Sequence, residues 1–69
     1  MNKIEILDLM IDYAILNWKY PFYESEREDA RQDLTDGKEH FIENLLEDIE
    51  YNPARCEDAK KLLELVKTI

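Results

Sequence analysis

Hydrophobic residues recur at intervals of three and four along most of this chain, a spacing that places them on one face of an α-helix. The first series comprises Ile4, Leu7, Ile11, Ala14 and Trp18. Asn2 and Glu5 have the spacing of a capping box at the start of this series. Pro21 disfavours helical geometry in the residue before it, so we predict a first helix over about residues 3–20.

A second, shorter helix is predicted over about residues 26–35. Ser25 and Glu28 have the spacing of another capping box. The segment offers only Ala30 and Leu34 for burial, so its hydrophobic face is small. It is therefore either a helix of one or two turns or a part of the next helix, joined to it through Gly37.

Two longer helices are predicted over about residues 37–51 and 53–68. Asp36 and Glu39 form a candidate capping box for the first, and Asn52 and Pro53 suit the N-cap and first helical position of the second. The predicted inner faces carry Phe41, Ile42, Leu45, Leu46 and Ile49, and then Ala59, Leu62, Leu63, Val66 and Ile69. The outer face of the last helix pairs charges of opposite sign three and four residues apart, as on a solvated helix.

No run of residues alternates as a strand would, so the predicted fold is all-α, a small bundle of three to four short helices. The length of 69 residues predicts a single helical domain over residues 1–69. Such a chain buries a modest core, and one cysteine cannot form an intrachain disulfide. Extra stabilisation is therefore expected from oligomerisation or from a partner.

The location is predicted from the start of the chain and from its cysteine content. Glu5, Asp8 and Asp12 interrupt the first apolar stretch, which argues against a signal peptide and against a membrane span. The single cysteine is typical of a reducing compartment. We therefore expect a cytoplasmic protein.

The net charge of −8 is concentrated in the middle of the chain. Between Glu24 and Glu50 stand eleven acidic residues and three basic ones, Arg27, Arg31 and Lys38, whereas the rest of the chain holds six of each. Nucleic acids and anionic membranes are themselves negatively charged, so neither is expected as a direct partner. The charge favours a basic surface on another protein.

Four glutamates of the third predicted helix form an acidic stripe, namely Glu39, Glu43, Glu47 and Glu50. At 100° per residue they fall within an arc of about 80°, and residues four apart rise about 6 Å along the axis. That rise is close to the distance between successive phosphates along a nucleic-acid strand. This distance exceeds the axial rise of about 3.4 Å because the backbone winds around the axis. The stripe would therefore fit a groove built for phosphates. The alternative is that these glutamates only keep the helix soluble.

Aromatic residues are concentrated just before the acidic segment. Trp18 is in register with the first apolar series and is predicted to pack in the core. Tyr20 and Tyr23 flank Pro21 and are candidate anchors for a partner, because tyrosine combines a large contact area with a polar tip. The alternative for both tyrosines is that they line the core.

Catalytic motifs are absent from the sequence, which contains no glycine-rich phosphate loop, no G-x-S-x-G and no H-E-x-x-H. We therefore expect neither enzymatic activity nor a cofactor. Aligning Gly37 with the glycine of an EF-hand loop places Gln32 and Leu34 at liganding positions, which argues against that calcium site. His40 is predicted to lie on the surface and Cys56 to be buried, so no metal site is expected.

The first helix suggests an alternative function. Of the eighteen residues from Lys3 to Tyr20, twelve are hydrophobic, which is more apolar surface than a few short helices would cover. The chain would then be a structural homo-oligomer, such as a homodimer, or a subunit of a complex. Its contact would centre on Leu9, Met10, Tyr13 or Leu16.

In size, charge and helicity the chain is similar in type to small acidic proteins of phages and mobile elements that inhibit host enzymes, some by imitating DNA. It is also similar in type to antitoxins and immunity proteins. The favoured function is therefore a protein-binding module, with inhibition of a nucleic-acid-handling enzyme as its sharpest form. Glu39, Glu43, Glu47 and Glu50 would supply the charge, and Tyr20 and Tyr23 the anchors.

Overall fold

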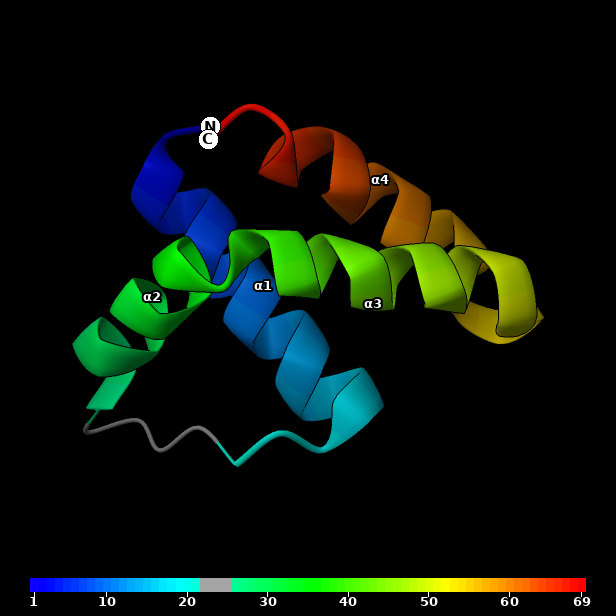
Figure 1. Ribbon diagram of the computed structural model, residues 1–69, viewed down its shortest axis with the longest axis horizontal. Helices are drawn as coiled ribbons and strands as arrows, with labels where there is room; N and C mark the ends of the chain where they lie inside the picture. The colour runs from blue at the N-terminus through cyan, green and yellow to red at the C-terminus, as the bar shows by residue number, and fades with distance from the viewer. Residues whose placement is uncertain (22–25) are drawn as a thin grey trace. The chain divides into compact units, whose positions relative to one another are not determined.

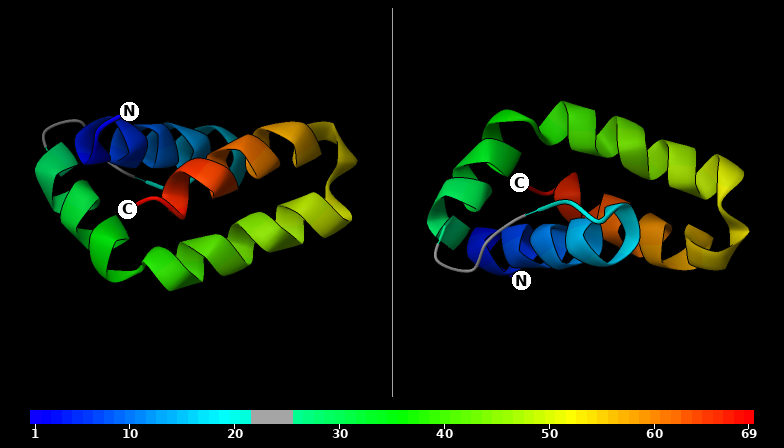
Figure 2. Two further views of the ribbon diagram at one scale, coloured as in Figure 1. Left: turned by 90° about the horizontal axis from the view of Figure 1, so that it is seen from above. Right: turned by 90° about the horizontal axis from the view of Figure 1, so that it is seen from below.

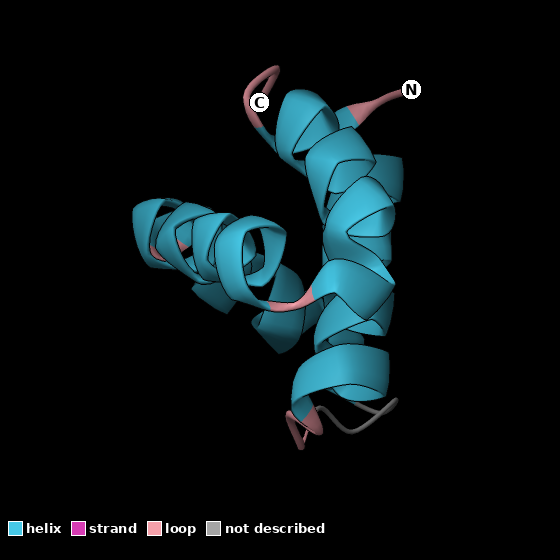
Figure 3. Cartoon of the chain, turned by 90° about the vertical axis from the view of Figure 1, so that its right-hand side faces the viewer, coloured by secondary structure: helices cyan, strands magenta, loops and turns pink. Residues whose placement is uncertain are grey.

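The computed structural model describes residues 1–21 and 26–69, which form four α-helices and contain no strand (Figures 1 and 3). The helices are α1 (Lys3–Trp18), α2 (Arg27–Asp36), α3 (Lys38–Tyr51) and α4 (Cys56–Val66), with the short 3₁₀ helix η2 (Pro53–Arg55) before α4. The predicted all-α class is confirmed. The chain divides into two compact units, Met1–Asp36 and Gly37–Ile69. The prediction of a single domain stays a prediction.

The start of α1 follows the predicted capping. The backbone N–H of Glu5 donates to Asn2 Oδ1 at 2.9 Å, and the Asn2 N–H donates to Glu5 Oε1 at 3.5 Å, which completes the capping box. At the other end Lys19 has left-handed geometry, with φ 56° and ψ 33°. The N–H groups of Lys19 and Tyr20 both donate to the carbonyl of Ala14, so the helix ends before Pro21.

The buried face of α1 differs from the predicted one. Its buried residues are Ile6, Leu7, Met10, Ile11, Tyr13 and Ala14. Ile4 was predicted to be buried but is 56% exposed, because the buried face is turned toward Ile6 and Met10. Trp18 is only half-buried, with its ring edge-to-face on Tyr13 at a centroid distance of 5.3 Å.

The helix α2 packs against α1 and buries Ala30 and Leu34, as predicted. It ends at Asp36 and does not merge with α3. The predicted capping box of Asp36 with Glu39 is wrong, because Gly37 is the N-cap of α3 and has no side chain to offer. The Asp36 carboxylate instead accepts a hydrogen bond from Gln32 Nε2 at 3.1 Å. Ser25, predicted to cap α2, lies outside the described residues.

In the second unit α3 and α4 lie side by side and run in opposite directions (Figure 2). The buried apolar residues of this pair are Phe41, Leu45, Ala59, Leu62, Leu63 and Val66. The predicted face of α4 is confirmed, except that Ile69 lies beyond the helix and is half-buried. On α3 the buried arc is narrower than predicted. Ile42 and Ile49 are half-buried, and Leu46 is 49% exposed.

Candidate partner-binding surface

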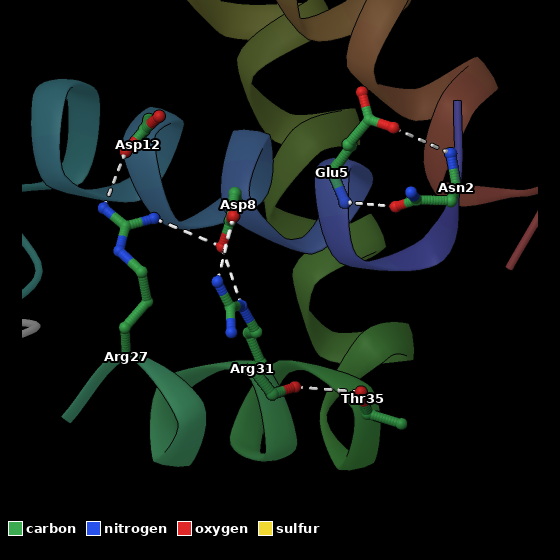
Figure 4. Close-up of polar contacts among 7 residues, drawn as sticks. All are labelled: Asn2, Glu5, Asp8, Asp12, Arg27, Arg31 and Thr35. Atoms are coloured by element: carbon green, nitrogen blue, oxygen red, sulfur yellow. Dashed lines mark hydrogen bonds and ion pairs between the residues drawn. The ribbon is translucent and has the colours of Figure 1, made fainter.

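Two arginines of the acidic segment pair with acids of α1 (Figure 4). Arg31 donates to both carboxylate oxygens of Asp8, from Nε at 2.8 Å and from Nη2 at 3.1 Å. Arg27 lies 3.2 Å from Asp8 through Nη1 and donates from Nη2 to Asp12 Oδ1 at 3.3 Å. Both helices place these residues four apart, so the charges meet along one side of the α1–α2 contact. We call these four residues the carboxylate clamp.

The contacts of the clamp shift the pKa values of Asp8, Arg27 and Arg31. The hydrogen bond from Arg31 holds the pKa of Asp8 below its ordinary value, with help from Arg27 and against the opposing effect of desolvation. The bonds to Asp12 and Asp8 raise the pKa of Arg27, and the bond to Asp8 raises the pKa of Arg31. These contacts therefore favour the charged forms of the three groups and hold α2 on α1.

The carboxylate of Asp48 is the one buried charged group among the described residues, at 3% exposure. Its Oδ1 lies 3.3 Å from Arg55 Nε and accepts a hydrogen bond from Asn52 Nδ2 at 3.0 Å. Asn52 precedes Pro53 at the N-cap of η2, as predicted, but its side chain turns back to Asp48 and makes no capping bond. The ion pair of Asp48 with Arg55, which Asn52 supports, joins α3 to η2. We call it the turn pair.

The third basic residue of the acidic segment, Lys38, is also engaged. Its Nζ donates to the backbone carbonyl of Ile69, between the two ends of the second unit. Arg27, Arg31 and Lys38 therefore all contact groups other than the four glutamates of the acidic stripe. Lys38, which precedes the stripe directly in sequence, is thus bonded to a backbone carbonyl.

All four glutamates of the stripe are exposed on α3. Within the second unit, residues 37–69, no lysine or arginine forms an ion pair with any of them. Glu43 lies 3.9 Å from His40 Nδ1, and both side chains are more than 70% exposed. On α4, by contrast, Lys60 pairs with Glu57 at 3.8 Å and Lys67 with Glu64 at 3.9 Å. The second unit therefore has one paired and one unpaired outer face.

Two exposed hydrophobic side chains lie near the stripe on α3, and neither was predicted from the sequence. Leu46 is 49% exposed and Tyr51 is 71% exposed, both on α3. At 100° per residue Leu46 lies about 20° from Glu39 and about 40° from Glu50. A surface of this kind offers both charge and apolar contact to a partner. Leu46 was predicted on the inner face of the helix, so its exposure was not expected. Its four-residue spacing from Ile42 does not by itself define which part of the helix is covered.

The other predicted site residues are distributed differently. Tyr20 is 56% exposed and belongs to the first unit, whereas the stripe belongs to the second. Tyr23 lies outside the described residues. His40 is on the surface, as predicted, but Cys56 is half-buried and not fully buried. No cluster of three potential metal ligands occurs among the residues described.

The predicted contact for self-association is only half available. Met10 and Tyr13 are buried, so they are removed from that prediction. Leu9 is 38% exposed and Leu16 is 70% exposed, and both remain on the outer side of α1. The predicted contact is therefore reduced to Leu9 and Leu16.

Comparison with protein-family models, with curated proteins and with solved structures found no match to this chain. Across the described part of the chain, none of the helices combines the length and the apolar character needed to cross a membrane.

Proposed function

We propose that this protein is a binding module whose acidic stripe on α3 engages a basic surface of a partner protein. The observation that supports this most directly is the difference in pairing between the carboxylates. Asp8 and Asp48 are satisfied by arginines, whereas the stripe is exposed and has no lysine or arginine partner among the described residues. An exposed patch of one sign attracts a partner of the opposite sign and accelerates encounter.

The sharpest form of this proposal is inhibition of a nucleic-acid-handling enzyme in the cytoplasm. Such enzymes present grooves lined with Lys and Arg, which neutralise phosphates. Carboxylates at about 6 Å intervals along α3 suit the same groove. The protein would then occupy the groove without binding nucleic acid itself.

The experiment is affinity capture from a cell lysate at low and at high salt, with quantitative identification of the retained proteins. The test variant is Glu43→Gln/Glu47→Gln, and the matched control is Glu57→Gln/Glu64→Gln on the paired face of α4. Both variants remove two exposed charges from the same unit. We expect basic proteins captured by the wild type and by the control to be lost with the test variant and at high salt. Equal retention by both variants would contradict the proposal.

A second candidate function is self-association through α1, favoured by the exposure of Leu9 and Leu16. The substitution Leu9→Ser/Leu16→Ser removes both apolar side chains from the outer side of the helix. If α1 mediates a homo-oligomer, sedimentation velocity should show a larger species in the wild type that this variant abolishes. A wild-type protein that stays monomeric at high concentration would contradict this candidate.

A further inference from the structure

An apolar band runs along α3 beside the acidic stripe. It consists of Ile42, Leu46 and Ile49, spaced four and then three residues apart. At 100° per residue these side chains fall within an arc of about 60°. Ile42 and Ile49 are half-buried, and Leu46 is 49% exposed. The band is therefore partly covered within the protein and partly open to solvent.

The residues of the band have the same spacing as the apolar residues of an amphipathic helix that docks on a protein surface. An amphipathic helix docks by placing residues at i, i+3 or i+4, and i+7 against a matching apolar surface. The stripe borders the band on one side, with Glu39 and Glu50 nearest to Leu46. A helix lying on the band would therefore have its flanking side chains within reach of these carboxylates.

We infer that this face of α3 binds a basic amphipathic helix of the partner protein. Its apolar residues would pack on Ile42, Leu46 and Ile49, and its Lys and Arg side chains would pair with the stripe. This inference rests on the proposed function and specifies the form of the basic surface. The band contributes few side chains, so we expect micromolar affinity, with the charges governing association and the apolar contact governing dissociation.

A second copy of the chain is a poorer occupant of this face. It would bring its own net charge of −8 and would place four like-charged glutamates against the first four. Juxtaposed like charges disfavour association. A basic segment without apolar residues is also a poorer occupant, because it would leave Leu46 in water. Charge complementarity and the open leucine together select a helix that is both basic and amphipathic.

The test uses a synthetic helical peptide of about five turns, or about 18 residues. Leucines stand at i, i+4 and i+7, lysines and arginines flank them, and alanines fill the remaining positions. Its partner is a scrambled peptide of identical composition, which keeps the charge and disperses the leucines. Binding is measured by fluorescence anisotropy at low and at physiological salt, and the contact is mapped by amide chemical shifts.

The variants are Leu46→Ser on the band and Leu16→Ser as the control, an exposed leucine of the first unit. Both positions are open to solvent, so the fold should survive, which circular dichroism verifies. We expect the amphipathic peptide to bind at least about fivefold more tightly than the scrambled one. Leu46→Ser should weaken the amphipathic peptide about fivefold, as the loss of a central apolar contact does, whereas Leu16→Ser should not.

Equal binding of the two peptides, or binding unchanged by Leu46→Ser, would overturn this inference. If Glu43→Gln/Glu47→Gln still weakened both peptides, the proposed function would stand without it. If that double variant weakened neither peptide, the proposed function would fail as well. Failure of the amphipathic peptide to bind at low salt, or weakening by Leu16→Ser in place of Leu46→Ser, would also overturn the inference.

Discussion

At the α1–α2 contact, Asp8 accepts hydrogen bonds from Arg31 at 2.8 and 3.1 Å, whereas Glu47 on α3 is exposed and has no ion pair in the described part of the chain. Both are carboxylates, and both stand on helices of one small protein. The clamp uses its charges to hold two helices together, because each has a directed partner. The stripe contributes nothing of this kind to the fold. Acidic residues of this chain therefore occur in two settings: some are paired where two helices meet, and others are exposed on α3.

The largest loss of stability is expected at the turn pair. Replacing Asp48 by Ala leaves the half-buried Arg55 guanidinium and the Asn52 amide without this carboxylate. We expect a loss of about 2–3 kcal/mol in the free energy of unfolding, from the loss of hydrogen bonds to a buried charged group. A domain of this size holds only about 3–5 kcal/mol in total. Urea denaturation followed by circular dichroism measures the change.

Two controls accompany Asp48→Ala. Asp48→Asn keeps an acceptor for Asn52 and should lose less stability than the alanine variant. Glu47→Ala removes an exposed neighbour and should change the free energy of unfolding by less than about 0.5 kcal/mol. Equal effects of Asp48→Ala and Glu47→Ala would show that the two carboxylates are not distinguished by their surroundings.

The clamp should give the next largest effect. Asp8→Asn weakens the paired contact with Arg31 and the ion pair with Arg27, whereas Asp12→Asn affects only one contact of a side chain that is 62% exposed. We therefore expect Asp8→Asn to lower the melting temperature more than Asp12→Asn and less than Asp48→Ala. Differential scanning fluorimetry on the three variants establishes the order. A larger effect at Asp12 would contradict the assigned geometry of the clamp.

The stabilisation that the clamp provides should be lost at low pH. The folded-state pKa of Asp8 is lowered from 3.8, chiefly by the hydrogen bond from Arg31. The folded state therefore holds this proton less tightly than the unfolded chain, and the stabilisation is present above pH 3.8 and lost as pH falls through the lower folded value. Melting curves of wild type and Asp8→Asn should converge at low pH. A difference that persists or grows in acid would contradict this sign.

The smallest change in stability is expected on the stripe. Replacing Glu43 and Glu47 by Gln removes like charges four residues apart, which disfavour a helix by a few tenths of a kcal/mol. The double variant should therefore be equally stable or slightly more stable, and the gain should shrink with added salt, which screens exposed charges. Urea midpoints at low and high salt test this. A clear loss of stability would mean that the stripe supports the fold.

Periodicity and caps were sufficient to predict the fold class and the approximate helix bounds. The capping box of Asn2 with Glu5 and the inner face of α4 were correct because both depend on local spacing. The turn pair was missed, since Asp48 was counted with the acidic segment. Its position did contain information, because at 100° per residue it lies only about 20° from the buried Phe41. A charged residue on an apolar arc requires a partner, and Arg55 follows seven residues later.

The clamp was also readable in principle. Asp8 with Asp12 and Arg27 with Arg31 are two pairs spaced by one helical turn, with opposite charge on the two helices. The pairing was overlooked because Arg27 and Arg31 were counted against the acids of their own segment and not against those of the first helix. The exposure of Ile4 and Leu46 could not be derived from sequence. It depends on how wide a face of each helix is buried by its neighbours. The spacing of apolar residues along a single helix does not define that width.

The central claim is that the stripe serves binding while the clamp and the turn pair serve the fold. The most direct measurement is the affinity of the basic amphipathic peptide for three proteins as a function of salt: wild type, Glu43→Gln/Glu47→Gln and Glu57→Gln/Glu64→Gln. We expect weaker binding and a shallower salt dependence for the first variant alone, and a free energy of unfolding for each variant within about 0.5 kcal/mol of that of the wild type. Two variants that bind equally well, or that lose affinity and salt dependence to the same extent, would contradict it.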